Sequence, residues 1–128
     1  MIGKVIATLL QANTDLTDLV DTNSIYPYVC NENTSLPFIV YIVDSITPIY
    51  DKDNWDYDEC TFSVESYSKG YAALEDIAYQ VREALELKAG TYESIKVRNL
   101  RMVSQEEEGF EMAFSNKLTF TIEIIAYE

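Results

Sequence analysis

The residues best suited to binding a ligand lie in the acidic segment DKDNWDYDE, residues 51–59. Asp51 and Asp53 begin like a calcium loop, in which closely spaced carboxylate oxygens surround a hard cation. The pattern then fails, because Trp55 stands at a ligand position and Asp56 at the position of the required glycine. We therefore expect no metal ion here, and we interpret the segment as solvated or partner-facing.

The rest of the chain contains no recognisable catalytic constellation. Histidine is absent, which excludes His-based triads, Cys–His dyads and His-containing metal sites. Four glycines and no Gly-rich motif leave no cradle for phosphate. A carboxylate pair for acid/base catalysis stays open among 22 acidic residues, but it requires two groups about 5–10 Å apart across a cleft. We predict a protein that is not an enzyme, with no catalytic residue and no cofactor.

The two cysteines, Cys30 and Cys60, have a spacing that matches no metal or redox motif. Each lies beside or within an apolar segment. We therefore predict two small buried hydrophobic side chains in preference to a disulfide, as suits a reducing cytoplasm.

The charge balance is strongly acidic, with a formal net charge of −13 and a sequence pI near 4.2. Proteins that bind nucleic acid through its phosphates need clustered lysine and arginine, whereas here only Arg98 and Arg101 approach a pair. The sequence therefore argues against specific nucleic-acid binding and against attachment to an anionic membrane. The apolar N-terminus is interpreted as a structural helix instead of a signal peptide, because Asn13, Asp15 and Asp18 follow it closely.

The hydrophobic period changes from two to about 3.6 residues within the segment 61–87, which predicts a strand that leads directly into an amphipathic helix. The whole chain, residues 1–128, is predicted to be a single α+β domain in the order α-β-β-β-α-β-β. Its curved antiparallel or mixed β-sheet is expected to pack against two helices. The expected elements are a helix over residues 2–12, an extended piece over 24–29, strands over 36–46 and 61–67, a helix within 68–87, and strands over 95–103 and 110–128.

Several local signals predict how these elements begin. Thr14 or Asp15 is expected to cap a further short helical turn, and Ser68 is expected to cap the second long helix. Pro27 has no N–H to donate to a neighbouring strand, so its segment is not expected to be a central strand with a neighbour on that side.

Other signals predict how the elements are connected. The near-continuous apolar run over 36–46 predicts a strand covered on both faces. Residues 47–59 are expected to form a loop, residues 89–94 a turn, and residues 104–109 a hairpin turn that uses Gly109.

The chain contains ten tyrosines and one tryptophan, and tyrosine is favoured at protein–protein contacts because it combines apolar area with a polar tip. Aromatic side chains within the acidic loop are hard to explain as core. The predicted partner contacts are Trp55, Asp56, Tyr57 and Asp58 on that loop, with Glu106, Glu107 and Glu108 at the expected hairpin tip.

Pieces of the sequence, taken in order, are similar to one known family. They are ANTDLTDLV (12–20), IYP (25–27), LPFIVY (36–41), the strand CTFSVESYS (60–68) before the helix YAALEDIAYQVREAL (71–85), GTY (90–92) and VRNLRMVSQEEE (97–108). The chain resembles the tail-completion, or tail-terminator, family of long-tailed bacteriophages and prophages. The acidic segment 47–59 departs from the family's pattern.

The resemblance implies a structural protein made in the bacterial cytoplasm and incorporated at the head-proximal end of the virion tail. Such proteins form a ring, typically a hexamer, which stops tail-tube polymerisation and joins the tail to the head connector. The expected partners are therefore other copies of the chain, the tail-tube protein and the head connector protein. The negative charge suits a ring through which DNA must slide, and the subunits' mutual repulsion predicts that assembly strengthens with added salt. Two alternatives are a head–tail connector or minor tail protein of similar fold, and an acidic cytosolic binding module.

Overall fold

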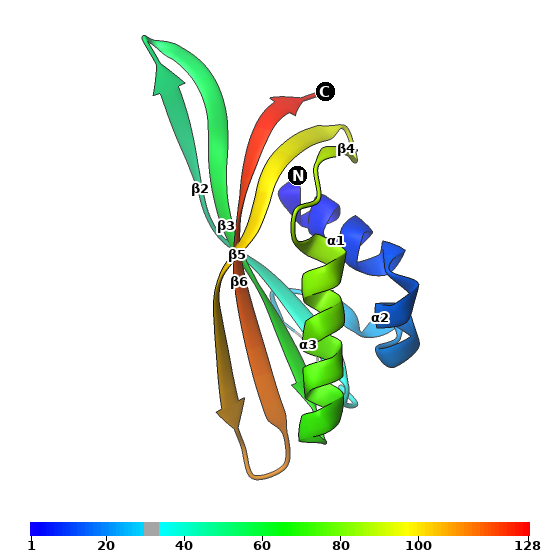
Figure 1. The fold of residues 1–128 in the computed structure, drawn as a ribbon. Helices are drawn as coiled ribbons and strands as arrows, with labels where there is room; N and C mark the ends of the chain where they lie inside the picture. The colour runs from blue at the N-terminus through cyan, green and yellow to red at the C-terminus, as the bar shows by residue number, and fades with distance from the viewer. Residues whose placement is uncertain (30–33) are drawn as a thin grey trace.

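The computed structural model describes residues 1–29 and 34–128 (Figure 1). Its helical elements are α1 (Ile2–Ala12), α2 (Thr14–Leu19), the short 3-10 helix η1 (Thr22–Ser24) and α3 (Tyr71–Leu85). Its strands are β1 (Ile25–Pro27), β2 (Phe38–Asp51), β3 (Asn54–Ser68), β4 (Gly90–Tyr92), β5 (Ile95–Gly109) and β6 (Phe114–Tyr127). The predicted α+β class and the order of the main elements are confirmed.

The strands form one mixed sheet in the order β1-β2-β3-β6-β5-β4. Strand β1 runs parallel to β2, and the other neighbours are antiparallel. The helices lie together on one side of the sheet, and two long hairpins, β2–β3 and β5–β6, extend to opposite ends of the molecule (Figure 1). Pro27 lies in the edge strand β1, as its missing N–H predicts.

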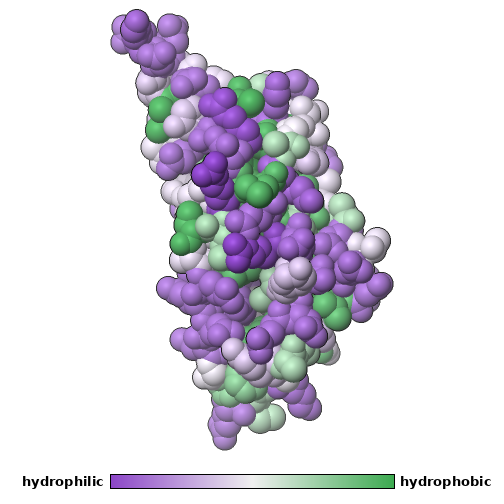
Figure 2. Space-filling view, in the orientation of Figure 1, coloured by the Kyte–Doolittle hydropathy of each residue, from purple (hydrophilic) through white to green (hydrophobic). Residues whose placement is uncertain are grey.

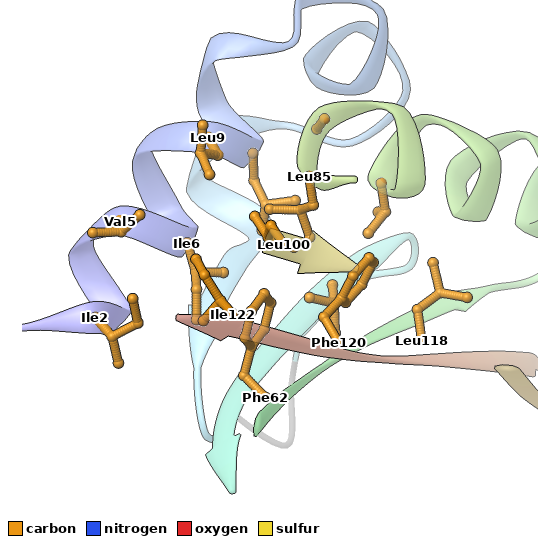
Figure 3. Close-up of a cluster of buried hydrophobic side chains, with 14 of the residues drawn as sticks. Ile2, Val5, Ile6, Leu9, Phe62, Leu85, Leu100, Leu118, Phe120 and Ile122 are labelled. Carbon is orange, nitrogen blue, oxygen red and sulfur yellow. The ribbon is translucent and has the colours of Figure 1, made fainter. Parts of the chain in front are cut away.

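The core lies between the sheet and the helices, where apolar side chains of α1 meet those of β3, β5 and β6 (Figure 3). The rings of Phe62 and Phe120 stack with centroids 5.3 Å apart at its centre. The apolar faces of α1 (Ile2, Val5, Ile6, Leu9, Leu10) and of β6 (Leu118, Phe120, Ile122, Ile124) are buried. The predicted amphipathic character of α3 is confirmed, since one face of the helix is buried and Tyr71 in its first turn is exposed; the buried residues are Leu74, Ile77, Ala78, Val81, Ala84 and Leu85.

The largest correction concerns residues 47–59, which form paired strands instead of a loop. Strands β2 and β3 pair all the way to Asp51 and Asn54. Lys52 and Asp53 both adopt left-handed backbone angles, with φ of 48° and 72°, as a two-residue hairpin turn requires. The strands extend beyond the core here, so both of their faces meet water and no apolar alternation marks them.

The predicted position of the second hairpin turn is wrong for the same reason, since these strands also extend beyond the core. Strand β5 continues to Gly109, so residues 104–109 are strand, and the turn lies at 110–113. Residues 90–92, expected within a turn, form the short strand β4, and Glu93 and Ser94 make the turn with positive φ.

Strand β2 is not covered on both faces over 36–46. Only Ile39 and Val40 are buried, and residues 44–48 are all exposed, because the helices cover only the first part of the strand.

The predicted caps also differ. Asn13 caps α2, its side-chain oxygen accepting from the Leu16 N–H, and Gly70 begins α3 without a side-chain cap. Ser68 belongs to β3.

Candidate assembly surfaces

The predicted contact residues lie on two separate hairpins at opposite ends of the sheet. Asp58 pairs with Ile124, whereas Ser68, at the other end of β3, pairs with Phe114 next to the β5–β6 turn. At about 3.3 Å per residue, these two ends of β3 are about 33 Å apart. The structure therefore brings Trp55, Asp56, Tyr57 and Asp58 together in one group and leaves the three glutamates in another.

Trp55 is held in place near the end of the β2–β3 hairpin. Its Nε1–H donates to Asp58 Oδ1 at 2.9 Å, and Tyr127 Oη donates to Asp58 Oδ2 at 2.6 Å. The two aromatic rings lie 6.2 Å apart, and Trp55 remains 41% exposed. Burial and the bond to Asp58 raise the pKa of the Tyr127 phenol. An exposed aromatic ring that is already fixed loses little rotamer freedom when a partner binds.

Tyr57 points to the face of the sheet away from the helices. Its ring lies 5.5 Å from the Arg98 guanidinium carbon, and Arg98 Nε donates to Glu123 Oε1 at 2.6 Å. Burial by itself raises the pKa of the Glu123 carboxyl. The hydrogen bond from Arg98 and the nearby positive charges outweigh burial, so the pKa is lowered overall. Asp56 is exposed. The hairpin thus presents aromatic and charged groups on both faces.

Glu106, Glu107 and Glu108 lie along β5, not at the hairpin tip, which corrects their predicted position. Glu107 faces the helices, and both of its carboxylate oxygens are 3.0 Å from Tyr71 Oη, which donates to them and whose pKa is raised by this bond. Its two neighbours alternate to the other face, where Glu106 is paired in register with Lys117. All three residues line one groove, but their carboxylates point to different faces of the sheet and do not converge on one point.

The turn of the β5–β6 hairpin carries two exposed apolar residues that the sequence prediction did not include. Phe110 is 51% exposed and Met112 is 75% exposed, and the Phe110 N–H closes the turn on the Ala113 carbonyl at 2.8 Å. Turns favour Gly, Pro, Asn, Asp and Ser. A Phe and a Met in a turn are therefore unusual, and this could have marked the two residues as candidate contacts.

The surface seen in Figure 2 is mostly polar, with apolar residues in small scattered groups and a strongly hydrophilic β2–β3 tip. Among residues 1–29 and 34–128, no group of three or more Cys, Asp or Glu side chains is arranged to hold a metal ion. Within the same residues no helix is long and apolar enough to cross a membrane.

Cys60 is a free, fully buried thiol, and burial raises its pKa to about 12, with smaller contributions from Asp44 and Asp58. The prediction of a small buried hydrophobe is confirmed for Cys60. Cys30 lies outside the described residues.

Comparisons with known proteins point to one family. The family model described as "Tail completion protein gp17" matches residues 4–111. The fold is similar to that of a solved chain from the "Virion of native gene transfer agent (GTA) particle", at 16% identity and a TM-score of 0.80 over 94% of this chain and 92% of that one. A second solved chain is 11% identical with a TM-score of 0.59, covering 94% of this chain and 96% of its own length. No curated protein matches the sequence.

Proposed function

The chain belongs to the tail completion protein gp17 family and is a structural protein of a phage-type tail, and we propose that it terminates the tail. In this proposal, several copies, typically six, form a ring on the head-proximal end of the tail tube. The ring stops addition of further tube subunits and presents the surface to which the head connector binds. The family match over residues 4–111 carries the proposal.

The arrangement of the hairpins supports a subunit that contacts different partners at its two ends. A ring needs a head-to-tail contact between two non-identical faces of each subunit. The β2–β3 and β5–β6 hairpins extend to opposite ends of the sheet and carry different side chains (Figure 1). We propose that the group of Trp55, Asp56, Tyr57 and Asp58 contacts one component of the tail, and that Glu106, Glu107 and Glu108 face another.

The acidic composition supports the same role. A channel wall that repels phosphate cannot hold DNA in place as it passes, so a net charge of −13 per subunit favours sliding over binding.

The decisive experiment is electron microscopy of particles assembled in cells that lack this chain. Tail tubes of uncontrolled, excessive length support a terminator, because nothing stops polymerisation. Tubes of normal length that fail to join heads would instead identify a head–tail connector and overturn the proposal. Complementation with the intact gene is the control, since it must restore both tube length and joining.

The contact group is tested by Trp55→Ala in the same assay. We expect this variant to fold but to yield fewer joined or terminated particles, because Trp55 is exposed and contributes little to the core. Tyr79→Ala is a matched control for Trp55, since Tyr79 is a 60% exposed aromatic residue on α3, outside the β2–β3 hairpin.

A further inference from the structure

An apolar groove lies where α1 begins, beside strand β2. Its lining includes Met1, Lys4, Tyr28, Tyr41, Val43 and Ile46, and its volume is about 470 Å³. Three of these residues are well exposed: Met1 is 69%, Tyr28 54% and Ile46 41% accessible to solvent. Apolar surface of this kind on a protein with a mostly polar exterior marks an interaction site.

The groove carries a single charge. Its lining contains one charged side chain, the Lys4 ammonium group, and no acidic residue. The groove is therefore locally basic on a chain whose net charge is −13.

The turn of the β5–β6 hairpin has the opposite character. Phe110 and Met112 are its two exposed apolar side chains, and Glu108 and Glu111 stand beside them in the sequence. An apolar tip with acidic flanks is complementary, in both polarity and charge, to an apolar groove with basic flanks.

The tip cannot reach the groove of its own chain. Ile46 in the groove pairs with Cys60 on β3, whereas the hairpin turn adjoins Ser68 at the other end of that strand. The strand extends about 26 Å from Cys60 to Ser68, and about 13 Å from Val64, which pairs with the nearer groove residue Tyr41. The two surfaces are held apart by one continuous sheet, so only a second molecule can bring them together.

We propose that the β5–β6 turn of one copy of this chain docks into the apolar groove of the next copy. Phe110 and Met112 fill the groove, and Glu111 approaches Lys4. The turn and the groove are different surfaces of the chain, so the contact is head-to-tail and can close into a ring. This inference rests on the ring assembly proposed above and identifies its subunit contact.

The apolar side chains supply most of the affinity, and the charges mainly select the orientation. Burial of one large apolar side chain corresponds to about tenfold to hundredfold in Kd. A partly solvated ion pair such as Lys4–Glu111 contributes about fivefold at most. Loss of both apolar tip residues should therefore weaken association by at least about 100-fold.

The test uses two variants of the whole chain, one with an altered turn and one with an altered groove. The first is Phe110→Asp with Met112→Asp, and the second is Lys4→Glu with Ile46→Asp. All four residues are exposed or partly exposed, so both variants should fold, as circular dichroism would verify. Sedimentation velocity should find each variant monomeric, while an equal mixture forms a heterodimer and nothing larger, because only one intact tip meets one intact groove. Leu87→Asp, which removes another exposed apolar side chain, should associate like the wild type.

A second measurement covers assembly that occurs only on a tail tube. A photo-cross-linking amino acid in place of Met112 should, in assembled tails, attach to residues 41–46 of another copy, whereas the same group in place of Leu87 should not. Cross-links to the tube protein alone, or variants that associate as the wild type does, would overturn the docking contact. Tube length is scored separately with the wild-type chain. Normal termination alongside failed docking would refute only this contact, whereas failed termination would refute the proposed function.

Discussion

Asn116 is the polar residue whose replacement should most increase stability. It lies on β6 between Ser66 of β3 and Glu107 of β5, and it is 1% exposed. Among the described residues, neither its Oδ1 nor its Nδ2 has a hydrogen-bond partner. A buried amide without partners loses its bonds to water on folding and gains nothing in return, so Asn116→Val should stabilise the fold.

The expected gain follows from that desolvation. Burying an unpaired amide costs about 1–3 kcal/mol, and valine adds a small preference for strand geometry. At roughly 2.1 cal/mol/K per residue, unfolding of 128 residues has an entropy near 270 cal/mol/K, so each kcal/mol raises Tm by about 4 °C. Asn116→Val should therefore raise Tm by about 4–11 °C.

Differential scanning calorimetry measures this shift, with Thr119→Val as the control. Thr119 lies on the other face of the same strand and is partly exposed, so its replacement reports strand preference alone and should change stability by less than about 0.5 kcal/mol. Asn116→Asp should destabilise, and the loss should grow with pH, because burial raises the carboxyl pKa in the folded state above its unfolded value. A fall in Tm for Asn116→Val would show that the amide is hydrogen-bonded in solution, and the reasoning would be refuted.

Four further predictions concern other parts of the chain. Tyr127→Phe removes the hydroxyl that donates to Asp58, so stability should fall by about 0.5–1.5 kcal/mol, and hydrogen exchange in the β2–β3 hairpin should accelerate more than exchange in the core. Leu100→Ala deletes a fully buried side chain and should cost about 2–5 kcal/mol in chemical denaturation; a smaller loss would mean that the site collapses around the change. Cys60, with a pKa near 12, should resist iodoacetamide at pH 8 in the folded protein and react after unfolding, as peptide mapping by mass spectrometry would reveal. Assembly of the proposed ring should strengthen as salt rises, because screening reduces repulsion between subunits of charge −13; assembly that is indifferent to ionic strength in light scattering would count against this electrostatic account.

The parts of the fold that the sequence predicted are those with one face in water and one in the core. Side chains such as Phe120 and Ile122 alternate with polar residues because burial selects them, and this selection leaves a visible period. Strands β2, β3 and β5 continue past the core, where both faces are solvated and burial selects nothing. A composition rich in Asp, Glu, Asn and Ser then favours a loop or turn, although the strands stay paired.

The irregular register of β5 shows a second limit. Asn99 adopts a positive φ of 54°, and the pairing shifts between Arg98 and Arg101. This bulge turns Leu100 into the core, whereas simple alternation from Val97 would place Leu100 on the opposite face.

The candidate contacts were predictable as residue types but not as an arrangement. Trp55 and Asp58 lie near each other in sequence, so their association could be anticipated. Tyr127, which completes the group, reaches Asp58 only because β3 pairs with β6. Periodicity within one segment does not predict the register of that long-range pairing. Glu107 contacts Tyr71 through the packing of α3 against the sheet, which periodicity within one segment does not predict either.

The placement of charge on the two hairpins restricts how copies of the chain can meet. Both hairpin ends are acidic, so contact between like ends of two subunits would bring carboxylates together, and such juxtaposition costs several kcal/mol. A symmetric contact between equivalent hairpin ends is therefore disfavoured, whereas a hairpin end that meets the basic groove at Lys4 is favoured. Because that contact joins unlike surfaces, each subunit leaves one tip and one groove for its neighbours, and in a finite assembly only a closed ring satisfies both on every copy. The acidic residues of the two ends are Asp51, Asp53, Asp56 and Asp58 on one hairpin and Glu106, Glu107, Glu108 and Glu111 on the other.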